Sequence, residues 1–239
     1  MKSSNKSRKP ITAAELMNQL NEDPDFVRRK QERDKHFAAL EKAFREAEKP
    51  VVDALNDVVG ISVKSVWELV NTATVYPNAI PVLVSHLRYQ YPYRVREAIA
   101  RALTVNYAGE DAYRALVREY KNCPESEDPA QHGFKWALGN AISVVTTGED
   151  FDEIVELVRD KRHGSSRDTM VLRLAKLKPD SSVDVLIDLL SDDEVAGFAV
   201  IALGRLKATK ASAQIGNLRR HPSAWVRKEA LRALEKIKG

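Results

Sequence analysis

The chain of 239 residues contains a single cysteine, Cys123, and lacks any apolar run long enough to cross a bilayer. One cysteine excludes an internal disulfide framework and a cysteine-rich zinc site, and it fits a reducing, cytoplasmic setting. The basic start MKSSNKSRKP is followed by no apolar run, so it does not predict a secretory signal. With 44% hydrophobic and 30% charged residues, the composition is that of a globular protein.

Net charge is also small, at +4, and it is unevenly spread. Residues 1–10 carry four basic and no acidic residues, residues 211–239 carry seven and two, and residues 50–210 carry nineteen and 23. A protein that grips a nucleic-acid backbone would usually show a continuous basic stripe. The pattern favours a solvated basic tail, a solvated last helix and a mildly acidic body.

The sequence shows no alternation of period two, so no sheet is expected; instead, apolar residues recur with helical spacing in repeated pairs of helices. The first helices are predicted at 78–87, 110–120, 150–158, 181–190 and 211–218. The second helices are predicted at 95–103, 134–142, 168–177, 195–206 and 226–237. The leucines Leu103, Leu138, Leu174, Leu203 and Leu234 mark steps of 35, 36, 29 and 31 residues. An earlier pair, 48–60 and 62–75, brings the total to about six pairs.

One such pair cannot bury its own apolar faces, but stacked neighbours can. Turn residues agree with this count. Pro50 marks the start of one helix, Gly60 closes it, and Ser65-x-x-Glu68 is typical of a capping box for the next. The sequence therefore predicts an all-α solenoid over residues 49–239.

Three stretches of this array match a known repeat pattern. They are Ala79-Ile80-Pro81-x-Leu83 with Val95-Arg96-x-Ala98-x-x-x-Ala102-Leu103, Leu186-x-x-Leu189-Leu190 with Ala202-Leu203-Gly204-x-Leu206, and Val226-Arg227-Lys228-Glu229-Ala230-x-x-Ala233-Leu234. The pattern resembles the HEAT-repeat superfamily, in particular its short bacterial form named after phycobilisome lyases, over about four fifths of the chain. The resemblance implies a right-handed α-α superhelix. It does not specify function, and nothing indicates bilin chemistry.

Residues 1–48 precede the array, with a basic disordered tail expected over 1–10. Thr12-x-x-Glu15 predicts the start of a short helix, and Asp23-Pro24 predicts the start of a helix over 24–48. Because the end of a solenoid exposes an apolar face, we interpret residues 11–48 as an N-terminal cap. The alternative is that the long helix docks a partner.

All seven tyrosines lie between residues 76 and 120, and the loop Tyr89-Gln90-Tyr91-Pro92-Tyr93-Arg94 holds three of them. Tyrosine and arginine are enriched at binding hot spots, so Tyr89, Tyr91, Tyr93 and Arg94 are candidates for partner contact. Packing is the equally weighted alternative. For Tyr107, Tyr113 and Tyr120 packing is expected.

A basic residue follows the apolar start of several second helices, at Arg96, Arg167 and Arg227 and, less clearly, Lys64. The resemblance implies a ladder of hydrogen bonds between adjacent repeats at this position. The alternative is a row of cations that grips an acidic partner.

The basic loop 159–167, which includes Arg162, His163 and Gly164, precedes a helix and is a weak candidate for a phosphate site. A solvated turn is favoured. The acidic insertion 122–129 is interpreted as a surface loop.

No pattern predicts catalysis, a cofactor or a metal site. The histidines His36, His86, His132, His163 and His221 show no i, i+4 pairing, and Cys123 lies in a loop expected to be flexible, with no histidine nearby in sequence. The leading hypothesis is therefore a non-enzymatic scaffold that binds a protein or peptide on its concave face and inter-helix loops. The alternatives are a nucleic-acid-binding protein similar to HEAT-like DNA glycosylases, and an accessory subunit of an enzyme.

Overall fold

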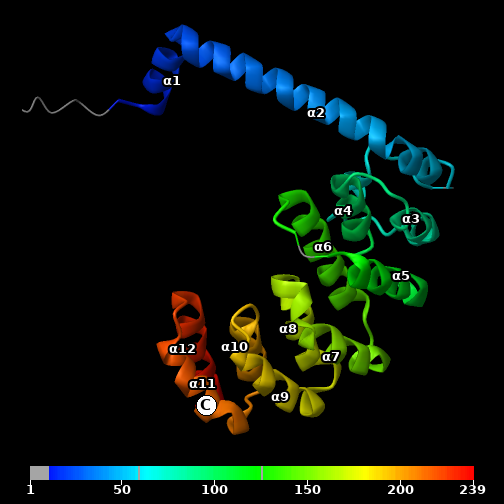
Figure 1. The fold of residues 1–239 in the computed structure, drawn as a ribbon. Coiled ribbons are helices and arrows are strands. Elements are labelled where there is room, and N and C mark those ends of the chain that lie inside the picture. The colour runs from blue at the N-terminus through cyan, green and yellow to red at the C-terminus, as the bar shows by residue number, and fades with distance from the viewer. Residues whose placement is uncertain (1–10, 59, 125) are drawn as a thin grey trace, which may run out of the picture. The chain divides into compact units, whose positions relative to one another are not determined.

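A computed structural model describes residues 11–58, 60–124 and 126–239 (Figure 1). The predicted basic tail at 1–10, and Glu125 of the acidic insertion, lie outside the described residues. The chain divides into two compact units, with the border between Glu46 and Ala47. The described residues form helices and turns and contain no strand, which confirms the all-α class.

The first unit contains α1 (Ala13–Glu22) and most of α2 (Pro24–Asn56). The predicted capping box is present, with the Glu15 amide donating to Thr12 Oγ1 at 3.2 Å and the Thr12 amide donating to Glu15 Oε2 at 2.8 Å. Asp23 Oδ1 accepts from the Asp25 amide at 2.9 Å at the start of α2. No residue of α1 is buried. The role of residues 11–48 as a cap stays a prediction.

The predicted division into one helix over 24–48 and another over 48–60 is wrong, because α2 continues without a break through Pro50 to Asn56. A proline inside a helix has no N–H to donate, so the carbonyl four residues earlier loses its helical partner. The following residues Val51, Val52 and Leu55 are buried. Burial of this apolar face keeps the last turns of α2 helical despite the lost hydrogen bond.

The predicted helix over 62–75 is also wrong, since this stretch forms only one short 3-10 helix, η1 (Val66–Leu69). Ser65 caps its start, since Ser65 Oγ accepts from the Trp67 amide at 3.3 Å, and Glu48 of α2 adds to this cap. Its Oε2 accepts from Ser65 Oγ at 2.9 Å and from the Val66 amide at 3.2 Å. Asn71, with a φ of 59°, then turns the backbone out of the helical region.

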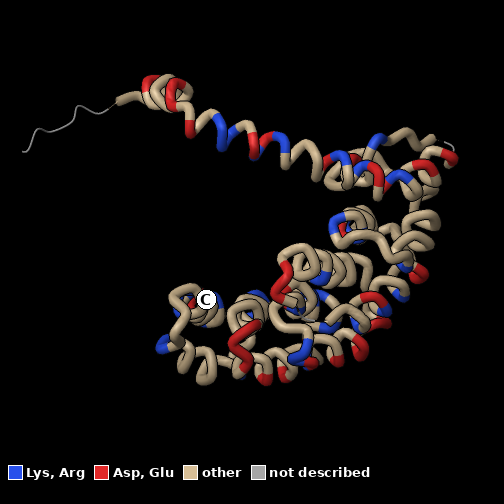
Figure 2. Tube along the Cα trace, turned by 45° about the horizontal axis from the view of Figure 1, so that its top comes forward, with Lys and Arg blue, Asp and Glu red and all other residues tan. Residues whose placement is uncertain are grey.

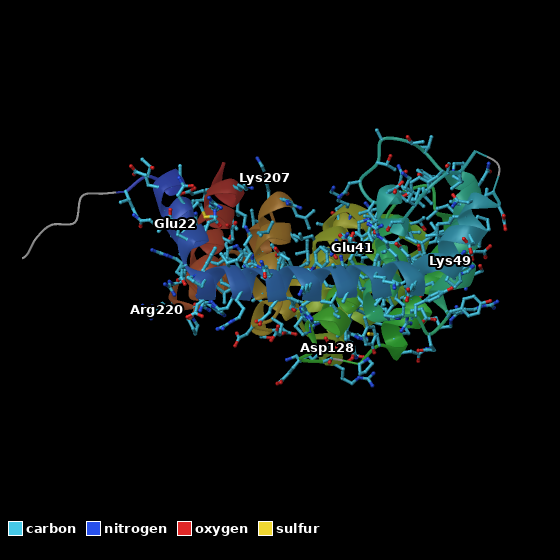
Figure 3. All side chains as sticks on the ribbon, turned by 90° about the horizontal axis from the view of Figure 1, so that it is seen from above. Glu22, Glu41, Lys49, Asp128, Lys207 and Arg220 are labelled. Atoms are coloured by element: carbon cyan, nitrogen blue, oxygen red, sulfur yellow. The ribbon has the colours of Figure 1, made fainter. Side chains whose placement is uncertain are left out.

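The five other predicted helix pairs are confirmed. The first helices are α3 (Ile80–Leu87), α5 (Gly109–Asn122), α7 (Phe151–Arg159), α9 (Pro179–Asp188) and α11 (Ser212–Asn217). The second helices are α4 (Tyr93–Ala102), α6 (Pro129–Val145), α8 (Asp168–Leu177), α10 (Ala196–Arg205) and α12 (Ala224–Lys238). The 3-10 turns that join or extend them are η2 (Pro77–Ala79), η3 (Gly148–Asp150), η4 (Lys161–Arg167), η5 (Leu189–Ser191), η6 (Thr209–Ala211) and η7 (Leu218–Arg220). Asp128, labelled in Figure 3, caps α6 by accepting from the Ala130 amide at 2.9 Å.

In residues 47–239 the second helices pack on one another in sequence, from α4 to α12. Figure 1 shows them along the inner side of a curve, with the first helices on the outer side. Small residues permit close contact in this inner layer: a Cβ added to Gly204 would lie 2.9 Å from the Cβ of Ala233, and one on Gly197 would overlap the Trp225 ring. Acidic residues follow the outer edge of the array (Figure 2). The array is therefore a superhelical repeat with a tightly packed inner layer.

Candidate functional site

The loop between α3 and α4 holds the exposed tyrosine that the sequence singles out. Tyr89 is 46% exposed, and its ring centroid lies 5.3 Å from that of His86 and 6.1 Å from that of Tyr91. The Arg88 guanidinium lies 5.5 Å from the centre of the Tyr89 ring. The rings therefore form one contiguous aromatic surface.

These rings border a cavity of about 420 Å³, which we name the aromatic pocket and which is lined by Pro50, His86, Tyr89, Gln90 and Tyr91. Within it, Tyr91 Oη lies 2.8 Å from His86 Nδ1. Burial, helped by the charge of Arg88, lowers the pKa of His86, and burial next to Tyr89 raises the pKa of Tyr91. Both side chains are thus neutral near neutral pH, and the pocket offers rings and neutral polar atoms to a ligand.

Tyr93 and Arg96 do not line the aromatic pocket but pack toward the next helix pair. The Tyr93 ring lies 5.9 Å from that of Phe134, and the Arg96 guanidinium lies 4.3 Å from the centre of the same ring. Arg96 Nη2 donates to Glu119 Oε2 at 2.7 Å, and Arg96 is 8% exposed. This geometry agrees with the predicted ladder of hydrogen bonds between adjacent repeats for Arg96. Arg94, which follows Tyr93 on α4, is exposed.

Arg167 is fully buried, at 0% exposure, so it contacts no partner in this conformation. Its Nη1 donates to the Val158 carbonyl at 2.9 Å and to Asp192 Oδ2 at 2.8 Å, and its Nε donates to the Gly164 carbonyl at 2.6 Å. Asp192 belongs to the following helix pair. These contacts agree with the favoured prediction of a hydrogen-bond ladder between repeats, rather than with the alternative of a cation that grips a partner.

The loop 159–167 is less solvated than expected, because His163 and Ser166 are buried in the 3-10 turn η4. The Arg162 side chain is 88% exposed and is held on Asp160, with Nη2 to Oδ2 at 2.7 Å. The hydrogen bond from Arg162 outweighs burial and lowers the pKa of Asp160 to about 2. Since this carboxylate already occupies Arg162, the geometry does not favour a phosphate site in the loop.

Arg227, on α12, lies in the same position of its helix as Arg96 does in α4. Its Nη1 donates to the carbonyls of His221 and Pro222, both at 2.7 Å. Among the residues that the structure describes, no carboxylate forms an ion pair with it. Arg227 is therefore accessible, unlike Arg167. Lys64, the less clear member of the predicted row, is exposed.

Sequence reasoning missed a row of side chains on the inner layer, which we name the inner row: Trp67, Arg101 and Trp136. The Arg101 guanidinium lies 5.9 Å from the centre of the Trp67 ring and 5.3 Å from that of Trp136. Arg101 Nε also donates to Glu97 Oε1 at 2.7 Å. Residues 67, 101 and 136 are spaced like the anchoring leucines, so the repeat step was the signal that could have found them.

The inner row continues to α8, where Trp136 Nε1 donates to Asp168 Oδ2 at 3.1 Å. Burial raises the pKa of Asp168, although the Trp136 hydrogen bond opposes the shift. With Glu97 and Asp168, two indole rings, one arginine and two carboxylates thus lie on four elements, η1, α4, α6 and α8. The members of the inner row are partly exposed.

Nothing among residues 11–58, 60–124 and 126–239 brings three metal-ligating side chains together. Cys123 is buried at the end of α5, which corrects the expectation of a flexible loop. Tyr113 and Tyr120 are buried as expected. Sequence reasoning missed a buried polar cluster around Tyr120, whose ring lies 4.4 Å from that of His163 and whose Oη lies 2.8 Å from Ser166 Oγ.

No family model matches the chain, and no curated protein matches it. Among solved structures, the chain is similar to a designed armadillo repeat protein, with 16% identity over 72% of this chain and 91% of that chain and a TM-score of 0.37. The all-α repeat fold is therefore established by the helices themselves. None of the helices in the described ranges combines the length and apolar character needed to span a bilayer.

Proposed function

We propose that the helical array is a non-enzymatic scaffold that binds a segment of another protein on its inner layer. The observation that supports this is the inner row, in which Arg101 lies between the rings of Trp67 and Trp136. Tryptophan and arginine are among the residues most enriched at binding hot spots: the indole is large and rigid, and the guanidinium stacks on rings and donates several hydrogen bonds. Stacked repeats present such residues as one extended surface.

The charge of the inner row favours a protein segment over a nucleic acid. Glu97 pairs with Arg101, and Asp168 accepts from Trp136. One carboxylate on the central cation and a second on the Trp136 indole oppose a polyphosphate backbone, whereas a peptide offers amides and side chains of both signs.

The aromatic pocket is a second surface for the same function. It lies at the inter-helix loops, and Tyr89 is exposed at its edge. A pocket lined by neutral rings suits an apolar or aromatic side chain of a partner. We include in the same proposal that the repeats are of the HEAT type and that the protein is cytoplasmic. The single buried Cys123 fits a reducing compartment.

Quantitative affinity capture from a lysate of the source organism tests this function. We compare the wild-type chain with the double variants Arg101→Ala/Trp136→Ala and Tyr89→Ala/Tyr91→Ala. Arg114→Ala is the matched control, since that side chain is 72% exposed on the outer helix α5. A hot spot contributes about 2 kcal/mol or more, so specific partners should be depleted roughly 30-fold by the inner-row variant. Equal recovery by all four proteins, each with an unchanged circular-dichroism spectrum, would refute the scaffold proposal.

The nucleic-acid alternative is tested by a gel shift at two salt concentrations. Binding with a steep salt dependence would favour it, and no shift at low salt would eliminate it. A role as an accessory subunit of an enzyme would appear in the capture experiment as one stoichiometric enzyme partner.

A further inference from the structure

The last helix, α12, repeats a face that the rest of the array covers. In α4 this face consists of Arg96, Ala100 and Leu103, and in α8 it consists of Arg167, Val171 and Leu174. Residues spaced i, i+4 and i+7 lie on one side of a helix. All six of these side chains are buried, at 8% exposure or less.

In both covered cases the following helix pair supplies a carboxylate to the arginine. Arg96 pairs with Glu119 of α5, and Arg167 pairs with Asp192, which follows η5. Each acid comes three residues after a buried leucine, Leu116 in α5 and Leu189 in η5. The element that supplies the acid therefore carries the pattern Leu-x-x-Asp/Glu, whereas α6 and α10 are the helices that pack on α4 and α8.

The same positions of α12 are Arg227, Leu231 and Leu234, which we name the end face. Leu231 is 47% exposed, whereas its counterparts Ala100 and Val171 are at 0%. Arg227 bonds to the carbonyls of the turn that precedes its helix, as Arg167 does, but it pairs with no carboxylate of the described chain. The end face thus has the arginine and the leucines of a covered junction without the acidic segment.

The C-terminal segment that carries the end face is predominantly basic. Residues 211–239 contain seven basic and two acidic residues, and Arg220, labelled in Figure 3, is exposed in η7. Electrostatic complementarity steers association and rejects partners of like charge.

We propose that the end face binds an acidic segment of a protein, whose carboxylate pairs with Arg227 and whose apolar side chains pack on Leu231. This contact is separate from the inner row, so it does not depend on the inner-row proposal.

The probe is a fluorescent synthetic peptide of residues 179–194, PDSSVDVLIDLLSDDE, which carries both Leu189 and Asp192. Its binding to the full chain is followed by fluorescence anisotropy at low ionic strength. Arg227→Glu and Leu231→Asp should each weaken binding about 10-fold or more, because an ion pair or a buried apolar contact is lost. The exposed Arg205→Glu in α10 is the matched charge control and should change binding less than about 2-fold.

Thermal melts confirm that each variant is folded, and Leu231→Asp keeps the test valid if Arg227→Glu loosens α12. Absence of peptide binding would overturn the proposal, as would equal weakening by Arg205→Glu and Arg227→Glu. Sedimentation velocity provides a further arm: self-association that Leu231→Asp abolishes would assign the end face to a second copy and overturn the choice of occupant. Vesicles with anionic lipids that bind the wild type but not Leu231→Asp would likewise overturn it in favour of a membrane surface.

Discussion

Two arginine–aspartate pairs join the same neighbouring helix pairs, and they differ in where they lie. Arg167 and Asp192 meet at 2.8 Å in the packed interior, with side chains 1% and 8% exposed. Arg159 of α7 and Asp188 of α9 also meet at 2.8 Å, but on the outer side, with side chains 52% and 63% exposed. The comparison teaches that distance alone does not set the energy of an ion pair.

The surroundings of the two pairs explain why their removal should cost different amounts. Arg167 also bonds to two backbone carbonyls, so its removal leaves several buried acceptors without a donor. Arg159 and Asp188 are already solvated, and water replaces each of them.

The largest expected effect comes from breaking the buried pair. Arg167→Ala should lower the free energy of unfolding by about 3–5 kcal/mol, because it strands the Asp192 carboxylate. Urea denaturation followed by circular dichroism measures the change. The double variant Arg167→Met/Asp192→Leu should recover the part of the loss that comes from the stranded Asp192 carboxylate, but not the part from the Val158 and Gly164 carbonyls, which still lack their donor. A decrease in unfolding free energy of less than about 1 kcal/mol for Arg167→Ala would contradict this prediction, because it would equal the contribution of a surface ion pair.

A smaller effect is expected from packing in the same junction. Gly139 of α6 approaches the turn η4 so closely that an added Cβ would lie 2.2 Å from the Ser166 carbonyl oxygen. Gly139→Ala should therefore cost about 1–3 kcal/mol in unfolding free energy. Gly216→Ala in the outer helix α11 is the matched control, because nothing lies within 4 Å of its added Cβ. Equal stability of the two variants would contradict the tight junction.

Acidification tests the buried polar cluster at this junction. Burial, together with the charge of Lys135, lowers the pKa of His163 from 6.5. As the pH falls, the unfolded chain therefore protonates His163 before the folded chain does. The stability that neutral His163 contributes is present above pH 6.5 and is lost as the pH falls through the lower pKa of the folded chain. His163→Gln should reduce the drop in urea midpoint between about pH 7.5 and about pH 5.5. His86, whose pKa is also lowered, contributes in the same direction, so His86→Gln is the comparison.

The smallest effect is expected at the outer pair. Arg159→Ala should change the free energy of unfolding by about 0.5 kcal/mol or less, and added salt should reduce even that. A loss like that of Arg167→Ala would show that burial is not what distinguishes the two pairs.

Features set by neighbouring residues were predicted well from the sequence. The box at Thr12 and Glu15 and the cap at Asp23 are local, and each appears as expected. The helix predicted after Ser65 starts as expected, with Ser65 Oγ accepting from the Trp67 amide, but it stops at Leu69, and its cap also binds Glu48, seventeen residues earlier. Local patterns cannot reveal a partner that only the folded chain brings close.

The site was predictable to a smaller extent for the same reason. A ladder role was foreseen for Arg96 and Arg167, but their acids lie 23 and 25 residues away and carry no local signal. Tyr89 was correctly expected to be exposed, while Tyr93 proved to pack on Phe134. The residues of the inner row are spaced by one repeat. Their types differ, however, so the sequence gives no sign that the two tryptophans contact the arginine between them.

Gly197 and Gly204 lie where α10 meets α12, and both positions leave no room for a side chain. Because the helices can approach only as far as these residues permit, the two glycines help to fix the radius of the bend. Enlarging either one would open the arc. If the array binds a protein segment as proposed, these two positions would set the affinity without touching the ligand.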